Sequence, residues 1–282
     1  MLSYLHGFHA GNFADIQKHA ALTLVLRMLQ VKPSAIAMFD THAGSASYHL
    51  DDERARKTGE SDSGIQKVWQ FRSQLTSDDW AGLLEPLTSV NSGDPGDRVK
   101  IYPGSPALMH HYLREQDQLC AWELHPSEGQ SLADWAANRK GVRVIQKDGL
   151  GGLIGRLPPA QPRLLALIDP SYEVKQDYES VAETLIRAWK ACRHGVFMIW
   201  YPILPSAAYR TLKQAIVSSP IRKVYCHEVR LEQVPERGMQ GSGLLVVNPP
   251  WGFDERLNRM MSELSGAEAP DMSVSDEWLV PE

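Results

Sequence analysis

The sequence predicts an α/β protein with one mostly parallel, seven-stranded sheet, an antiparallel C-terminal hairpin and a small inserted helical subdomain. Two observations carry this prediction. Short apolar runs alternate with helical patterns, as in a chain of βαβ units. The runs are also continuously apolar, as expected for strands that helices cover on both faces. The candidate strands lie at 35–39, 118–123, 142–146, 164–168, 195–200, 223–229 and 244–248.

Helix-like segments separate most of these strands and lie at 106–116, 127–139, 177–193 and 205–217. The last connection differs, because residues 231–242 contain one proline and two glycines and show no helical period. This segment is too irregular for a crossover helix, so strands 223–229 and 244–248 should pair antiparallel. A nucleotide-type parallel sheet that ends in such a hairpin is the layout of S-adenosylmethionine-dependent methyltransferases rather than of NAD-binding domains.

Residues 51–100 interrupt the alternation of strands and helices. They are polar, contain a helix-like run at 61–75 and end in a Gly/Pro/Asp cluster at 92–97. We interpret them as a helical insertion, which leaves 1–50 and 101–282 as the core with its N-terminal arm. The arm leads into an amphipathic helix that should end near Leu29.

The composition indicates a protein of the reducing cytoplasm. Apolar residues make up 43% of the 282 residues, and the three cysteines form no CxxC pair. The longest apolar stretch, 20–28, is far shorter than the ~20 residues of a membrane span. The N-terminus also lacks the pattern of a signal peptide.

The net charge of −5 hides an uneven distribution. Residues 181–230 hold eight basic and two acidic side chains, whereas residues 231–282 hold three basic and ten acidic ones. A basic stretch can form a phosphate-binding face in an acidic protein, because phosphate is attracted by the local electrostatic potential rather than by the net charge. A solvated helix face explains the same charges equally well.

The residues after each strand are the candidate ligand contacts, because ligands of open α/β sheets bind at the carboxyl ends of strands. Asp40 to Gly44 follow the first strand, and the glycine would let a ligand approach the backbone. Glu123 follows the second strand and could accept the hydroxyls of an adenosyl ribose, although an ordinary strand-end charge is the simpler reading. Asp148 and Gly149 follow the third strand, where a tight turn is the default explanation and an adenine contact the alternative.

The loop Asp169-Pro170-Ser171-Tyr172 follows the fourth strand and gives the sharpest signal. A carboxylate, a free proline carbonyl and an aromatic ring suit a flipped base with an exocyclic amine. Asp169 and the Pro170 carbonyl would accept the two amine hydrogens, and Tyr172 would stack. The alternative is a simple turn before the next helix.

A similar Asn-Pro-Pro-Trp pattern occupies residues 248–251. It follows the hairpin strand rather than a strand at the centre of the sheet. We therefore interpret it as structural and place the chemistry at Asp169.

The N-terminal segment is rich in histidine, with five of the ten histidines in the first 49 residues. A metal site is the minority reading, because the segment lacks enough carboxylate or cysteine partners. The segment could instead close over a ligand or pack on the domain. Ser105 before Pro106 predicts an N-cap with proline at the first helical position.

Together, these segments resemble the RlmJ-type methyltransferases, which modify the N6 of an adenine in 23S ribosomal RNA. The matching stretches keep their order along the whole chain: MLSYLHGFHAGNFADIQKH, FDTHAGSASY, RKTGE, YPGSP, LREQD, ELHPSE, KDG, LIDPSYE, WYP, GSGLLVVNPPW and WLVPE. The resemblance implies a class I methyltransferase (Rossmann-like) fold with a helical insertion. It also implies a cytoplasmic enzyme without a metal, expected to be a monomer, that acts on 23S rRNA in a protein-free or early assembly state.

The same resemblance implies the roles of individual residues. Asp169 would be catalytic, Tyr4 would meet the RNA, and His6 and Lys18 would assist it. The contacts to S-adenosylmethionine would come from His19, His42, Ser105, Glu123, Asp148, Gly149 and Asp169.

The sequence departs from the family at Ser171, where the usual loop has a second proline. Because serine removes one φ constraint, we expect a looser but active loop. The alternatives are an adenine-N6 methyltransferase of DNA, and a catalytically weak nucleic-acid-binding protein linked to the use of external DNA.

Overall fold

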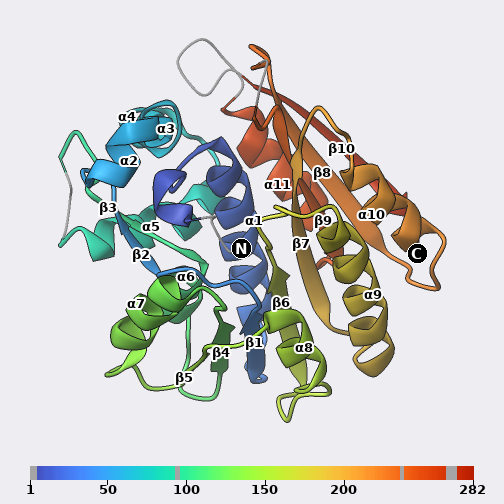
Figure 1. Cartoon of the computed structure of the whole chain (residues 1–282). Coiled ribbons are helices and arrows are strands. Elements are labelled where there is room, and N and C mark those ends of the chain that lie inside the picture. Colours follow the sequence, from blue (N-terminus) through green and yellow to red (C-terminus); the bar gives the residue numbers. More distant parts are fainter. Residues whose placement is uncertain (1–4, 93–95, 236–237, 265–271) are drawn as a thin grey trace.

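The computed structural model describes residues 5–92, 96–235, 238–264 and 272–282. Its centre is an eight-stranded sheet with the order β10-β8-β9-β7-β6-β1-β4-β5 (Figure 1). The strands are β1 (Ile36–Asp40), β4 (Gln118–Trp122), β5 (Val142–Ile145), β6 (Arg163–Ile168), β7 (Val196–Ile203), β8 (Val224–Leu231), β9 (Gly241–Val247) and β10 (Met272–Val280).

The pairing confirms the predicted mixture of parallel and antiparallel strands. Strands β7, β6, β1, β4 and β5 are parallel, while β9 is antiparallel to both β7 and β8. This is the class I methyltransferase arrangement with one strand added at the edge. The predicted number of seven was wrong, because β10 pairs antiparallel with β8. Most of β10 is at least partly exposed, so this strand shows no apolar run in the sequence.

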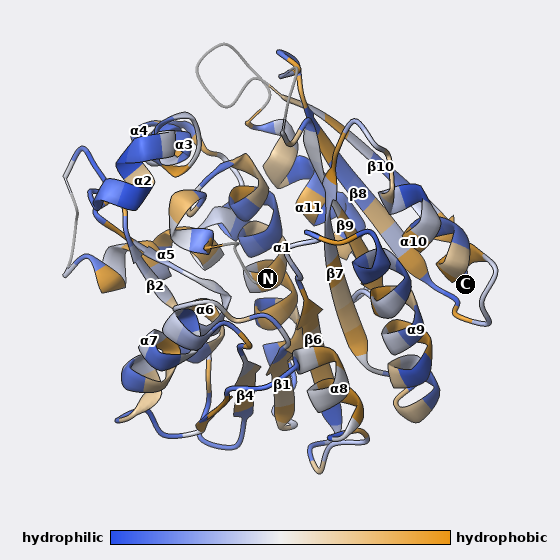
Figure 2. Ribbon diagram, viewed as in Figure 1, coloured by the Kyte–Doolittle hydropathy of each residue, from blue (hydrophilic) through white to orange (hydrophobic). Residues whose placement is uncertain are grey.

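Helices cover both faces of the sheet. The face that carries Met38, Leu165 and Leu167 packs against α1 (Phe13–Gln30), α6 (Ser105–His111) and α11 (Phe253–Ser262). The other face packs against α8 (Gly149–Ile154), α9 (Gln176–Ala191) and α10 (Tyr209–Val217), while α7 (Pro126–Ala136) lies beside β5. Figure 2 shows the central strands as mostly hydrophobic and α9 and α10 as banded, as two-sided burial requires.

The helices depart from the predicted ranges at a few places. Helix α6 ends at His111, before the predicted end at residue 116, and α8 and α11 were not predicted. Helix α8 contains three glycines in six residues, and glycine is a poor helix former. This explains why its sequence did not indicate a helix.

The segment at 51–100 is mostly helical and lies between two short paired strands, β2 (Ser47–His49) and β3 (Ile101–Pro103). Its helices are α2 (Glu53–Thr58), α3 (Glu60–Ser63), α4 (Ile65–Phe71) and α5 (Ala81–Val90). Trp69, Trp80 and Leu83 of this segment belong to the same buried cluster as α1. The boundary of a separate subdomain at 51–100 stays a prediction. None of the described helices is long and apolar enough to cross a membrane.

Candidate active site

Four neighbouring parallel strands end in acidic residues at one edge of the sheet. The spatial order β6-β1-β4-β5 places Asp169, Asp40, Glu123 and Asp148 in a row at the carboxyl ends. These residues come from distant parts of the chain, and only the parallel pairing aligns them. This edge is where open α/β sheets bind ligands.

Asp40 is the last residue of β1 and is fully buried. Its Oδ1 accepts a hydrogen bond of 3.3 Å from the backbone N–H of His42. Oδ2 has no hydrogen-bond partner among the described residues. Burial raises the pKa of Asp40 to about 7, although the nearby Ser105 hydroxyl opposes this rise. The sequence analysis noted Asp40 in the segment after the first strand but assigned no role to its carboxylate.

Ser105 lies in this site, but it is not the N-cap that its sequence predicted. The N-cap of α6 is Gly104, with an extended backbone (φ −72°, ψ 174°), and Ser105 is the first helical residue. The Gly104 carbonyl accepts the first helical bond from the Leu108 N–H at 3.0 Å. The Ser105 hydroxyl therefore does not cap the helix, and it lies near enough to Asp40 to lower the pKa of that carboxyl.

Glu123 joins the loops after β4 and β1. Its Oε2 accepts from the Gly44 N–H at 2.8 Å, and its Oε1 accepts from the His125 N–H at 2.7 Å. Each oxygen keeps a second lone pair for a ligand. The carboxylate is thus held in a fixed orientation at the end of β4.

Asp148 and Gly149 join the loop after β5 to the loop after β1. Asp148 is the N-cap of α8 and accepts from the Leu150 and Gly151 N–H groups, which confirms the expected turn. A Cβ atom at Gly149 would lie 1.9 Å from the Thr41 carbonyl oxygen. Only glycine fits this backbone contact.

Two histidines of the site are neutral at neutral pH because of burial. Burial lowers the pKa of His42 to about 4, and its Nδ1 lies 2.8 Å from the Thr41 hydroxyl. Burial lowers the pKa of His19 to about 3, and its Nδ1 lies 2.8 Å from the Tyr102 hydroxyl. The Nε2 of His19 is buried and has no hydrogen-bond partner among the described residues.

Asp169 follows β6 and forms an ion pair with Lys18 of α1. The Lys18 Nζ lies 2.6 Å from Asp169 Oδ2 and 5.6 Å from the ring centre of Trp200. Burial raises the pKa of Asp169 above its ordinary value, and the Lys18 ammonium limits that rise. The structure therefore joins two residues that are 151 positions apart in the sequence.

Tyr172 anchors this loop to the protein interior. Its backbone has a positive φ of 51°, its ring lies 4.3 Å from that of Tyr178, and its hydroxyl donates to the Trp200 carbonyl at 2.8 Å. Only 6% of the residue is exposed. Stacking of Tyr172 on a base would therefore require the loop to rearrange.

The N-terminal arm reaches the same place through His6, which contacts Asp15 of α1, a residue to which the sequence reasoning gave no role. Asp15 Oδ1 lies 3.0 Å from Lys18 Nζ, and Asp15 Oδ2 lies 2.9 Å from His6 Nε2. The structure thus brings His6 and Lys18 together next to Asp169. Tyr4 lies outside the described residues.

Glu60 of the RKTGE segment is a second residue that the sequence reasoning did not assign. Its carboxylate contacts His9 Nδ1 at 2.8 Å and accepts from the Asn12 side-chain amide at 2.9 Å. The hydrogen bond with Glu60 raises the pKa of His9, although burial of the imidazole acts in the opposite direction. Glu60 therefore fastens the arm to the inserted helices.

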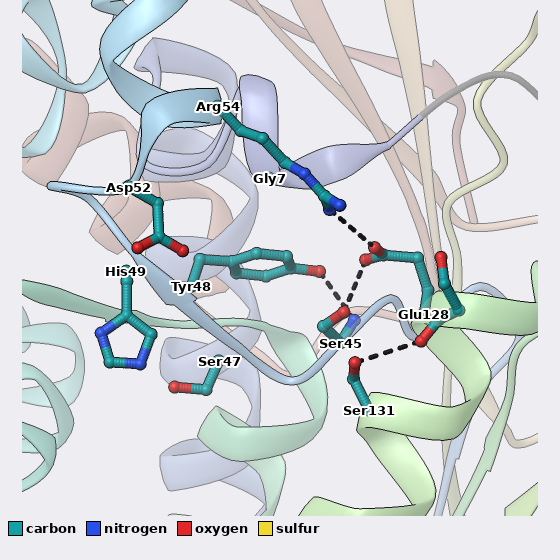
Figure 3. A pocket seen from close by; sticks show the side chains of 10 residues that line it. Gly7, Ser45, Ser47, Tyr48, His49, Asp52, Arg54, Glu128 and Ser131 are labelled. Carbon is teal, nitrogen blue, oxygen red and sulfur yellow. Dashed lines mark hydrogen bonds and ion pairs between the residues drawn. The ribbon is translucent and has the colours of Figure 1, made fainter.

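A cavity of about 230 Å³ lies beside the arm, between the β1–β2 loop, α2 and α7 (Figure 3). Gly7 lines it, and inside it the Ser45 hydroxyl donates to Glu128 Oε2 at 2.7 Å. Arg54 lies 3.9 Å from the other Glu128 oxygen. Of the sequence-predicted site residues that the structure describes, none lines this cavity.

The Asn248 loop lies at the amino ends of the parallel strands, opposite to the carboxyl ends that carry Asp169. Strand β9 runs antiparallel to β7, so its end lies beside the start of β7. The Asn248 side-chain amide donates to the carbonyls of Arg193 and Gly195 at 2.8 and 2.9 Å. This loop therefore has a structural place away from Asp169. No group of three or more His, Cys, Asp or Glu residues that could hold a metal occurs within the described ranges.

The fold and the acidic carboxyl edge together define a class I methyltransferase. A family model described as "Ribosomal RNA large subunit methyltransferase D, RlmJ" matches residues 33–280. The chain therefore belongs to this family of ribosomal RNA large-subunit methyltransferases.

Individual relatives agree with the family. The chain is 36% identical to "Ribosomal RNA large subunit methyltransferase J" of Escherichia coli and 34% identical to the protein of that name from Haemophilus influenzae. Each match covers 100% of both chains. Among solved structures, protein LPL1258 from Legionella pneumophila has a TM-score of 0.88 at 31% identity, over 96% of this chain and 98% of that one. A probable spermidine synthase from Corynebacterium glutamicum, at 11% identity and a TM-score of 0.51 over 98% and 79% of the two chains, shares the fold alone.

Proposed function

We propose that this protein transfers a methyl group from S-adenosylmethionine to the N6 of an adenine in 23S rRNA. The observation that carries the proposal is Asp169, a carboxylate just after β6 whose side chain is only 12% exposed and pairs with Lys18, in a member of a ribosomal RNA methyltransferase family. The reaction would take place in the cytoplasm on RNA that is protein-free or at an early stage of assembly.

The residues at the carboxyl edge fit S-adenosylmethionine by their chemistry. The ligand offers donors at its amino group, its ribose hydroxyls and its adenine amine, and the strand ends offer carboxylate acceptors. Asp40 Oδ2 and His19 Nε2 are buried polar atoms that gain partners if a ligand binds here. Glu123 would hold the ribose, and the turn at Asp148-Gly149 would hold the adenine, with His42, Ser105 and Asp169 completing the site.

S-Adenosylmethionine supplies an electrophilic methyl group on a sulfonium. The work left to this chain is to orient the adenine amine and to make its lone pair available. That lone pair is delocalised into the ring, so the amine is a poor nucleophile. Asp169 and the Pro170 carbonyl would each accept one N–H and favour a pyramidal nitrogen with a free lone pair.

Lys18 keeps Asp169 in the ionised form that accepts a hydrogen bond. Burial raises the pKa of Asp169, and the adjacent ammonium opposes this effect. Burial alone would lower the pKa of Lys18, but the carboxylates of Asp15 and Asp169 outweigh this effect and raise the pKa above its ordinary value. The 2.6 Å contact is therefore treated as an ion pair in this proposal. No strong base is needed, because the proton can leave after methyl transfer.

The test is Asp169→Asn, with 23S rRNA that lacks the modification as substrate. The variant should lose methyl transfer by about 100-fold or more, a typical effect of removing a positioned acid–base group. Its affinity for S-adenosylmethionine, measured by calorimetry, should stay within a few-fold of the wild-type value. Turnover close to that of the wild type would sink the assignment.

Mass spectrometry of 23S rRNA nucleosides from cells with and without the protein tests the product. N6-Methyladenosine should be reduced when the protein is missing. A parallel assay on duplex DNA separates the RNA enzyme from a DNA adenine methyltransferase. No binding of S-adenosylmethionine would favour a non-catalytic nucleic-acid-binding protein.

A further inference from the structure

Lys18 is one ammonium shared by two buried carboxylates. Its Nζ lies 2.6 Å from Asp169 Oδ2 and 3.0 Å from Asp15 Oδ1. The side chain of Lys18 is 6% exposed, that of Asp15 2% and that of Asp169 12%. Almost no water reaches this cluster, so each charge depends on the others.

The two carboxylates are held very differently. Asp15 lies in the first turn of α1 and also accepts from the Gly11 N–H and from His6 Nε2, both at 2.9 Å. Three contacts from different directions fix its position. Asp169 lies on a loop, and Lys18 is the side-chain partner that the structure gives its carboxylate.

Binding of the substrate amine to Asp169 changes how the charge of Lys18 is neutralised. When Asp169 also accepts a hydrogen bond from the amine, its negative charge is shared between the amine and Lys18, and it neutralises the ammonium less completely. A buried ammonium without a counter-ion is strongly unfavourable, because it has lost its hydration and gained no opposite charge. Asp15 stays in place and keeps the ammonium neutralised while Asp169 is engaged.

We propose that Asp15 is a positioning residue for methyl transfer, the permanent counter-ion of Lys18 that releases Asp169 for the substrate amine. The inference rests on the proposed function of Asp169. Through His6 and Gly11, the same carboxylate also ties the N-terminal arm to Lys18. The docking of the arm and the release of Asp169 therefore depend on one residue.

The test is Asp15→Asn, which keeps the shape and removes the charge. Asp169 is then the carboxylate that remains in contact with Lys18 among the described residues, and Lys18 should hold it away from the substrate. We expect kcat to fall about tenfold or more, within the range for lost positioning of a catalytic group. The dissociation constant of S-adenosylmethionine should stay within a few-fold of the wild-type value.

The pH dependence of kcat separates positioning from mere structural support. The charges that face Asp169 come from Lys18 and Asp15 of α1, from His6 of the arm and from Asp40 of β1. Because the charge of Asp15 raises the pKa of Asp169, Asp15→Asn should move the acidic limb of the profile to lower pH. Lys18→Met should move it to higher pH.

The matched control is Asp117→Asn. The Asp117 side chain is also fully buried and pairs with an arginine, Arg114, at 2.7 Å, far from the carboxyl edge. This variant should have a lower Tm but an unchanged kcat and acidic limb. Asp15→Glu keeps the charge and should leave the limb at its wild-type position, whether or not the asparagine variant folds.

A double-mutant cycle completes the test. If Asp15 acts through Lys18, Asp15→Asn combined with Lys18→Met should be no slower than Lys18→Met alone. The inference is overturned by an unchanged kcat in Asp15→Asn, by a limb that moves to higher pH, or by fully additive losses. An active Asp169→Asn variant would instead refute the proposed function itself.

Discussion

Two loops of this chain carry nearly the same residue pattern at opposite edges of one sheet. Asp169-Pro170-Ser171-Tyr172 follows β6, and Asn248-Pro249-Pro250-Trp251 follows β9. Strand β6 has six residues, so the carboxyl and amino ends of the central strands, where the two loops lie, are roughly 20 Å apart. The comparison teaches that the place of such a motif, and not its composition, decides its chemistry.

The surroundings of the two loops show why. The carboxylate of Asp169 is almost covered and faces the Lys18 ammonium, and the Tyr172 ring is buried beneath it. The amide of Asn248 donates to two backbone carbonyls, while Trp251 is 96% exposed. One loop holds a carboxylate against an ammonium at the carboxyl ends of the strands, and the other ties the end of β9 to the start of β7.

Among the substitutions that test the difference between the two ends of the strands, Gly149→Ala at the carboxyl ends should have the largest effect on stability and cofactor affinity. The new Cβ would lie 1.9 Å from the Thr41 carbonyl oxygen, so the β1 and β5 loops must separate. We expect a stability loss of about 2–4 kcal/mol, at the upper end for overpacking, and at least a tenfold weaker binding of S-adenosylmethionine. Thermal melts and calorimetry measure the two effects.

The control for this glycine is Gly252→Ala at the amino edge. Its Cβ would have nothing within 4 Å, but the residue has a φ of 78°. Strain of about 1–2 kcal/mol should lower the Tm and leave cofactor affinity intact. Equal losses of affinity in both variants would mean that the two edges do not differ in function.

An intermediate effect is expected from Asn248→Ala. The substitution removes two hydrogen bonds to the carbonyls of Arg193 and Gly195, and alanine is strained at a φ of 52°. A loss of about 2–3 kcal/mol in the free energy of unfolding follows, at an unchanged turnover per folded molecule. Denaturant melts and methyl-transfer assays on the same samples check it. A specific loss of turnover would break the assignment of this loop as structural.

The smallest effect is expected from Trp251→Ala. A side chain of a residue that is 96% exposed contributes little to packing, so stability should change by less than about 0.5 kcal/mol. Methyl transfer to 23S rRNA should not change. A higher KM for the RNA would show instead that the amino edge grips the substrate.

The charge distribution gives a second contrast between sequence and structure. The basic stretch at 181–230 and the acidic tail at 231–282 lie side by side, because β10 pairs with β8. Lys213 contacts Glu228 and Glu277 at 3.3 and 3.0 Å, and Arg230 contacts Glu228 at 2.9 Å. Part of the positive charge is therefore neutralised within the protein and does not form a phosphate-binding face.

The sequence by itself determined seven of the eight strands, the antiparallel hairpin and the acidic residues at the strand ends. These features depend on local apolar runs and on the rule that parallel strands expose their carboxyl ends at one edge. The family motifs then pointed to Asp169 and Lys18 as functional residues.

Only the tertiary structure decided which charged groups meet. Asp15 is three residues before Lys18 on one helix, but its role depends on Asp169, which is 151 residues beyond Lys18. The burial of Asp40, the contact of Gly149 with Thr41 and the pairing of the exposed strand β10 are likewise absent from any local pattern. The physical reason is that burial and charge proximity depend on long-range packing, whereas periodicity reports only on neighbours along the chain.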